Sequence, residues 1–166
     1  LPATLAASEA EVEAARGLPK PSLVFPNHND HAYAKVALDP QSLAFTREHI
    51  DRIEDPMLRQ MLWSALWNMT RDQQLTSIDF LAIIRDKIAT EASTELVDAV
   101  LGFAQTTLVR FVPDEWREEQ GRQLFASAWE TLKTAEGDRQ IIWTRALVGF
   151  AVTSADIERL AALADG

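Results

Sequence analysis

The sequence predicts an all-α protein of about seven helices, stacked as antiparallel pairs in a HEAT- or armadillo-like α-solenoid, with a short N-terminal β-hairpin. Two observations lead to this fold class. Helix-start signals recur about every 15 to 25 residues after Asp39, with short connections between them. Apolar residues between those signals follow the 3.6-residue helical period. We therefore expect a circular-dichroism spectrum dominated by helix.

Each expected helix has a recognisable first residue. In the first two, an aspartate is the N-cap acceptor and a proline follows it. Proline suits the first helical position because its missing N–H would have no partner there. The later starts carry Thr, Ser, Pro or Gly-Asp signals. In chain order the predicted starts are Asp39-Pro40, Asp55-Pro56, Thr76, Ser93 or Thr94, Val112-Pro113, Gly137-Asp138 and Ser154.

The helix faces differ in how much apolar surface they carry. In the 56–72 segment the polar residues Gln60, Ser64 and Asn68 recur every four positions, and most of the remaining circumference is apolar. We expect this helix to be packed on nearly all sides. Segments 97–111 and 125–132 carry a one-sided apolar stripe, which is typical of outer helices in a two-layer arrangement.

The chain divides into three parts. Residues 1–21 are rich in Ala, Glu, Pro and Gly and are predicted to be a largely irregular leader. Two β-prone runs, 22–25 and 32–38, flank a turn-rich segment and predict a β-hairpin over residues 22–38. Residues 39–166 are predicted to form the helical-repeat domain.

Composition excludes several classes of function. Twenty-five acidic residues against 16 basic ones give a net charge of −9, which disfavours nucleic acid as a partner. The chain has no cysteine, so it has neither disulfides nor thiolate metal ligands. No apolar run approaches the ~20 residues of a membrane span, and no signal peptide is evident. We expect a cytoplasmic location, and a chain that begins with Leu1 is expected to be a piece of a longer protein.

One loop contains residues that could bind a metal. His28, Asp30 and His31 lie within four residues, and His49 follows Glu48 further on, so a zinc site is conceivable. The favoured interpretation is a solvated loop, because Asn and Asp in turns bond to the local backbone. No nucleophile elbow accompanies any of the three histidines. We predict no catalytic, no cofactor-binding and no metal-binding residue in this chain.

Two further groups of residues have a structural and a functional interpretation. Trp63 and Trp67 could form an aromatic shelf for a ligand, but core packing is favoured because tryptophan buries a large area. The acids at 115, 118 and 119, with Arg117 and Arg122, could line a channel for a charged peptide end. The favoured interpretation is the solvated first turns of a helix, where acids are stabilised near the N-terminus.

The segment from Leu23 to Asp72 resembles the aminopeptidase N family of zinc metallopeptidases. The residues that carry the resemblance are Leu23-Val24-Phe25-Pro26-Asn27, Tyr33 to Asp39, Asp55-Pro56, Trp63 and Trp67-Asn68-Met69-Thr70-Arg71-Asp72. In that family a β-sandwich domain passes here into a C-terminal helical domain that closes over the zinc site. The resemblance implies that residues before Pro21 belong to the end of the β-sandwich. It also implies that the helical domain continues beyond Gly166. The His-Glu-x-x-His zinc motif of the family does not occur in this chain.

Two hypotheses for the function follow. The first is a non-catalytic C-terminal helical domain of a zinc-dependent aminopeptidase, inactive alone, which shapes the access of peptides to the active-site chamber. The zinc would belong to the parent enzyme, and the partners would be its catalytic and β-sandwich domains and a peptide substrate. The alternative is a freestanding helical-repeat scaffold that binds a protein. In addition, we expect an exposed apolar patch around Ile157, Leu160 and Leu163 to promote self-association.

Overall fold

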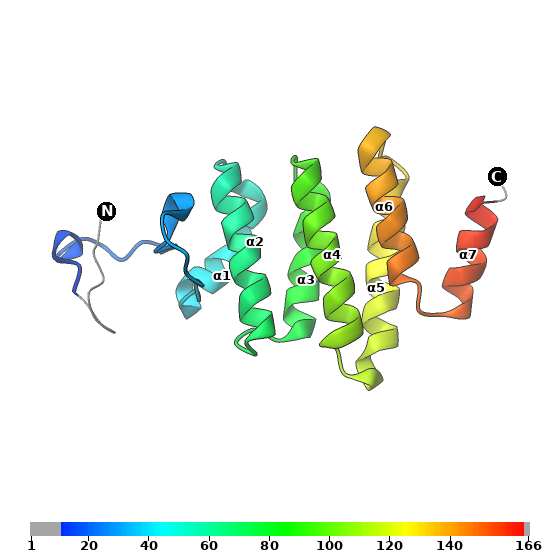
Figure 1. The fold of residues 1–166 in the computed structure, drawn as a ribbon, viewed down its shortest axis with the longest axis horizontal. Coiled ribbons are helices and arrows are strands. Elements are labelled where there is room, and N and C mark those ends of the chain that lie inside the picture. Colours follow the sequence, from blue (N-terminus) through cyan, green and yellow to red (C-terminus); the bar gives the residue numbers. More distant parts are fainter. Residues whose placement is uncertain (1–10, 165–166) are drawn as a thin grey trace.

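Within the described part of the chain, the fold consists of helices and irregular segments. The structure is a computed structural model and describes residues 11–164. Residues 11–164 contain seven α-helices, which follow one another along the molecule (Figure 1). They are α1 (Pro40–His49), α2 (Pro56–Arg71), α3 (Ser77–Lys87), α4 (Thr94–Arg110), α5 (Asp114–Leu132), α6 (Gly137–Phe150) and α7 (Ser154–Ala164). For the described residues the all-helical prediction and the seven helix starts are confirmed, whereas the stacking of the helices as a HEAT- or armadillo-like solenoid stays a prediction.

Short 3-10 helices occur between and before the α-helices. They span Glu13–Ala15, His28–Asp30, Ile50–Arg52 and Ile88–Thr90. The leader predicted for residues 1–21 is described only from residue 11, and its first ten residues lie outside the described range, as do Asp165 and Gly166. The boundaries of the three parts, 1–21, 22–38 and 39–166, stay a prediction.

Side-chain caps explain why the helices begin where they do. The carboxylate of Asp39 accepts from the backbone N–H groups of Gln41 and Ser42, and Asp55 accepts in the same way from Met57 and Leu58. Thr76 and Ser93 cap α3 and α4 through their hydroxyl groups. Each cap satisfies N–H groups that have no partner inside the helix, which is worth about 1 kcal/mol.

The helices pack in two layers. Helix α4 contacts both α2 and α6, and α3 contacts α5 as well as its sequence neighbours. Figure 1 shows α2, α4 and α6 side by side, with the connections alternating between the two ends of the helices. Large side chains from both layers fill the space between them, among them Trp63, Phe80, Phe125, Trp143 and Phe150. This packing holds α2 in a fixed position, with one face left for other contacts.

The predicted β-hairpin over residues 22–38 is wrong. No strand occurs in the described residues, and the 22–38 segment, called here the N-terminal arm, is irregular apart from its 3-10 turn. Asn27 is the reason: its side-chain amide donates to Asp30 and Ala32 at 3.1 and 2.8 Å and accepts from the N–H of Ala32 at 2.9 Å. Asn29 and Asp30 have positive φ values of 64° and 52°, which these residue types tolerate. The chain closes into a tight loop instead of pairing two strands.

A buried ion pair joins α2 to the connection between α3 and α4. Arg59 donates to both carboxylate oxygens of Glu91, at 2.8 and 2.9 Å, and to the carbonyl oxygens of Ile53 and Glu54. Glu91 also accepts from the N–H of Ser93 at 2.9 Å. Arg139 of α6 donates to the Glu91 carbonyl oxygen at 2.7 Å. Helices α2, α4 and α6 are therefore linked at one residue, α2 and the start of α4 through the carboxylate of Glu91 and α6 through its main-chain carbonyl.

The ion pair makes the stability of the fold sensitive to acid. Burial alone raises the pKa of Glu91, but the hydrogen bonds from Arg59 and Ser93 outweigh it and hold that pKa below its ordinary value of 4.5. As the pH falls below about 4.5, the unfolded chain takes up this proton more readily than the folded chain, so stability is lost. We expect the free energy of unfolding to fall more steeply between pH 5 and 3 (roughly the range over which carboxylates titrate) in the wild type than in Glu91→Gln. Parallel pH profiles from urea titrations would contradict this prediction.

Helix α7 attaches to the rest of the fold through few side chains. Asp156 is buried and accepts from the N–H groups of Val152 and Thr153, while the guanidinium of Arg159 lies 4.3 Å from the ring centre of Trp129. Leu160 packs against the core. The expected apolar patch is therefore limited to Ile157 and Leu163, which are 61% and 47% exposed. Self-association through this helix stays a prediction.

Candidate functional site

One face of α2 carries a row of three neutral polar side chains. Gln60, Ser64 and Asn68 follow at intervals of four residues, which places them about 6 Å apart along the helix axis. Gln60 and Ser64 are exposed, and Asn68 is half-buried. The opposite face of the same helix is in the core, with Leu62, Trp63 and Leu66 at most 2% exposed. The row is thus open to a partner on a helix that is otherwise held firmly.

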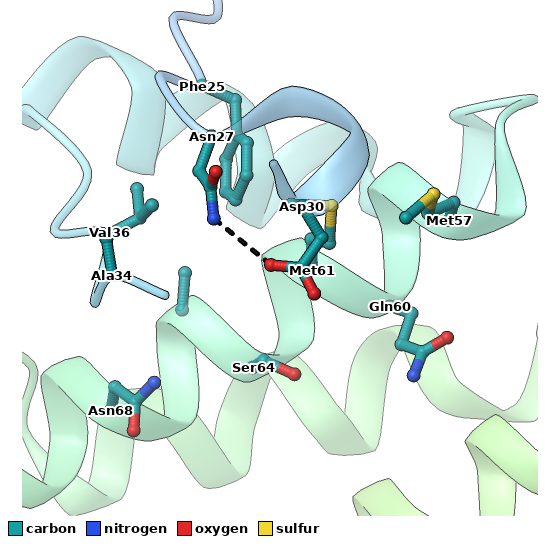
Figure 2. Close-up of a pocket in the computed structure, with 11 residues that line it drawn as sticks. Phe25, Asn27, Asp30, Ala34, Val36, Met57, Gln60, Met61, Ser64 and Asn68 are labelled. Atoms are coloured by element: carbon teal, nitrogen blue, oxygen red, sulfur yellow. Dashed lines mark hydrogen bonds between the residues drawn. The ribbon is translucent and has the colours of Figure 1, made fainter. Parts of the chain in front are cut away.

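The N-terminal arm lies along this face of α2 and leaves a cavity of about 240 Å³ (Figure 2). We call this cavity the α2 groove. Figure 2 shows Asp30 on the side of Met61, while Ala34 and Val36 lie towards Asn68. Its lining consists of Phe25, Asn27, Asp30, Ala34 and Val36 from the arm, and Met57, Met61 and Ala65 from α2 together with the polar row. Neutral hydrogen-bonding groups and apolar walls therefore face the same space.

Polar contacts at both ends fix the arm on the helices. The hydroxyl of Ser42 accepts from the N–H of Val24 at 3.0 Å and donates to Asp39 at 2.5 Å. The hydrogen bond from Ser42 holds the pKa of Asp39 below its ordinary value, against a smaller opposing effect of burial. At the other end, the ammonium group of Lys35 contacts the carboxylate of Asp72 at 2.9 Å. The arm is thus a fixed wall of the α2 groove.

The charges around the α2 groove are unevenly distributed. Near the first turn of α2, Asp30 lines the groove, and His28 lies 3.5 Å from the carboxylate of Asp55. Near the last turn, Lys35 and Asp72 neutralise each other. The end of the groove at Asp30 is therefore the one that favours a cation.

A zinc ion does not fit the loop that contains His28 and His31. Within residues 11–164, no group of three or more His, Cys, Asp or Glu side chains could hold a metal ion. Among the described residues, Asp55 is the acid that contacts His28, and Asp30 bonds to Asn27. Structural and catalytic zinc sites need at least three protein ligands. The absence of catalytic, cofactor and metal residues stays a prediction.

The chemical prediction can be measured on the purified chain. We expect no stoichiometric zinc after dialysis, because the loop supplies too few ligands. We also expect no release of an amino acid from an aminoacyl-chromogen. The metal content is measured by atomic absorption, with His28→Ala/His31→Ala as the control. Tight zinc that disappears in this control would contradict the prediction.

The two tryptophans of α2 lie in different environments. Trp63 is 2% exposed and belongs to the core, as the favoured interpretation predicts. Trp67 is half-buried, and its ring stacks on Phe103 with centroids 4.9 Å apart. Phe111 contacts the same ring edge-on, and the guanidinium of Arg71 lies 5.8 Å from its centre. The two side chains therefore do not form one shelf.

The charged residues at the start of α5 form local pairs. Arg117 donates to the carbonyl oxygens of Leu108 in α4 and Val112 in the connection that follows, and contacts Asp114. Arg122 pairs with Glu119, and this hydrogen bond lowers the pKa of Glu119. These contacts are those of a solvated first turn and a helix connection. A channel for a charged peptide end is not apparent in them.

Reasoning from the sequence did not identify the polar row as a candidate site. The interval of four residues is visible in the sequence, but a polar side on an apolar helix is most simply explained by exposure to water. The second wall of the α2 groove is the N-terminal arm, and its shape depends on the loop that Asn27 closes. The fourfold interval next to an Asn-containing turn is the only signal that could have pointed to this groove.

No described helix combines the length and the apolar character that a membrane span requires.

Comparison with known proteins identifies relatives of this chain. Residues 23–165 match the model of the family described as ERAP1-like C-terminal domain. An aminopeptidase N from Streptomyces lividans is 31% identical over 157 residues. The match covers 90% of this chain and 18% of the relative, so the chain spans about a fifth of the length of that protein.

Proposed function

Because the chain belongs to the ERAP1-like C-terminal domain family, we propose that it is the non-catalytic helical domain of a zinc-dependent aminopeptidase. The family match over residues 23–165 is the observation that carries this proposal. The similarity to an aminopeptidase N supports the same assignment. The zinc and the catalytic groups would belong to another part of the parent chain.

We further propose that the domain shapes the access of peptides to the active site. Its two layers of helices are consistent with stacked helical repeats, which commonly present an extended binding surface. The α2 groove offers both hydrogen-bonding groups and apolar walls on such a surface. In this proposal the catalytic and β-sandwich domains of the same chain are the partners, and the enzyme acts in the cytoplasm.

The coding sequence upstream of Leu1 tests the assignment to an enzyme. We expect a His-Glu-x-x-His motif with a downstream glutamate several hundred residues before Leu1, in one reading frame with it. A start codon directly before Leu1 would contradict the proposal and favour the freestanding scaffold. The expressed parent protein should then release N-terminal amino acids from peptides and lose this activity on removal of zinc.

A further inference from the structure

We propose that the α2 groove binds an extended peptide segment through its main chain, with Gln60, Ser64 and Asn68 bonding to alternate residues of that peptide. This inference deepens the proposed function, on which it rests for the origin of the peptide. The groove itself is a property of this chain and can be tested without the parent enzyme.

The spacing of the polar row matches the repeat of an extended peptide. Four residues of α-helix rise about 6.0 Å, and two residues of an extended chain span about 6.6 Å. Three side chains at intervals of four can therefore meet peptide groups at intervals of two. The mismatch over the whole row is about 1 Å, which is within the reach of the flexible Gln60 side chain.

The side chains of the polar row can both donate and accept hydrogen bonds. Primary amides both donate and accept hydrogen bonds, and so does the hydroxyl of Ser64. A peptide main chain offers one N–H donor and one carbonyl acceptor per residue. Neutral groups that both donate and accept can bond to the main chain of a peptide of any sequence, because the main-chain N–H and C=O groups recur at each residue.

The size and the walls of the cavity also suit an extended peptide. Its volume of about 240 Å³ is below the ~300–1,000 Å³ of pockets that enclose small molecules and cofactors. Because Gln60 and Ser64 are exposed, the groove can hold one edge of an extended chain without enclosing it. Met57 and Met61 on one wall are flexible and polarizable, and such side chains adapt to different apolar partners. Different apolar side chains of the peptide can therefore pack against these two methionines.

The negative charge at the Asp30 end of the groove favours a lysine in the bound peptide. Asp30 lines the groove near the first turn of α2 and accepts there from the Asn27 amide. A carboxylate can accept about four hydrogen bonds, so it retains capacity for an ammonium group. Asp55 and His28 lie near the same end, and the net charge of the chain is −9. We therefore expect a preference for lysine at the peptide position next to Asp30.

Fluorescence anisotropy with the 166-residue chain tests the proposal. The probe is a labelled peptide of nine residues, capped at both ends, made of Ala and Thr with one Lys. We expect Gln60→Ala, Ser64→Ala and Asn68→Ala each to weaken binding about 2- to 10-fold, the effect of one neutral hydrogen bond. Gln140→Ala on α6 is the matched control, because its side chain is exposed outside the groove. Thermal melts of all variants confirm that the fold is retained.

Methylation of single peptide nitrogens separates main-chain binding from side-chain binding. If the row pairs with alternate residues, N-methyl groups weaken binding at every second position and have little effect between. Asp30→Asn should reduce the preference for Lys over Glu, and asparagine also tolerates the positive φ at this position. Failure to bind at millimolar peptide, or binding that is indifferent to N-methylation and to the three alanine variants, would overturn the inference. A zinc motif upstream of Leu1 would still support the proposed function in that case.

Discussion

Replacing Glu91 with alanine is expected to lower the free energy of unfolding by about 3–5 kcal/mol. The change leaves the guanidinium of Arg59, whose side chain is 13% exposed, without its carboxylate partner. It also removes the acceptor for the N–H of Ser93. An uncompensated buried charge costs far more than the pair contributes when both partners are present.

Urea titration of the wild type and the variant measures this effect. Glu130→Ala is the matched control, because Glu130 pairs with Lys133 on an exposed face and should change stability by no more than about 1 kcal/mol. Arg59→Met/Glu91→Leu should lose less than the sum of the two single alanine variants, because no charge is left unpaired. A loss below about 1 kcal/mol for Glu91→Ala would contradict the prediction.

Replacing Trp63 with alanine is expected to cost about 3–5 kcal/mol. Trp63 is 2% exposed and lies between the two helix layers, so alanine leaves a cavity that the surrounding helices cannot fill. A domain with a total stability of about 5–15 kcal/mol loses a large share of it through this change.

Trp116 provides the comparison, since it is 50% exposed at the first turn of α5. Trp116→Ala should change stability by about 0.5 kcal/mol or less. Chemical denaturation followed by far-ultraviolet circular dichroism measures both variants. Equal losses for the two tryptophans would show that the layers do not pack around Trp63.

The helices could be predicted from the sequence because their signals are local. Asp39-Pro40 and Asp55-Pro56 contain both the cap and the first helical residue, and the structure uses each aspartate as an N-cap. The β-prone runs of the N-terminal arm, by contrast, led to a wrong prediction of a hairpin. A strand needs a partner to satisfy its main chain, and in the structure the bonds of Asn27 close a tight loop in which the two runs do not pair.

The contacts that fix the site could not be predicted because they are distant in the sequence. Arg59 and Glu91 are 32 residues apart, and Lys35 and Asp72 are 37 apart. No pattern in the sequence links such positions. The row of Gln60, Ser64 and Asn68 is visible as a spacing, but its second wall exists only after the arm has docked on α2. Local chemistry thus predicts the helices, and packing decides which faces become a site.

The most direct measurement for the proposed access role uses the full-length parent enzyme. The values of kcat and KM are compared between a nine-residue peptide and an aminoacyl-chromogen, in the wild type and in Ser64→Trp, which fills the α2 groove. Gln140→Trp is the control outside the groove. The access role predicts that Ser64→Trp raises KM for the peptide roughly tenfold without changing its kcat, as expected for the loss of substrate binding remote from the reacting bond. Both kinetic constants for the aminoacyl-chromogen should stay unchanged. Identical changes for the two substrates, or no change for either, would contradict it.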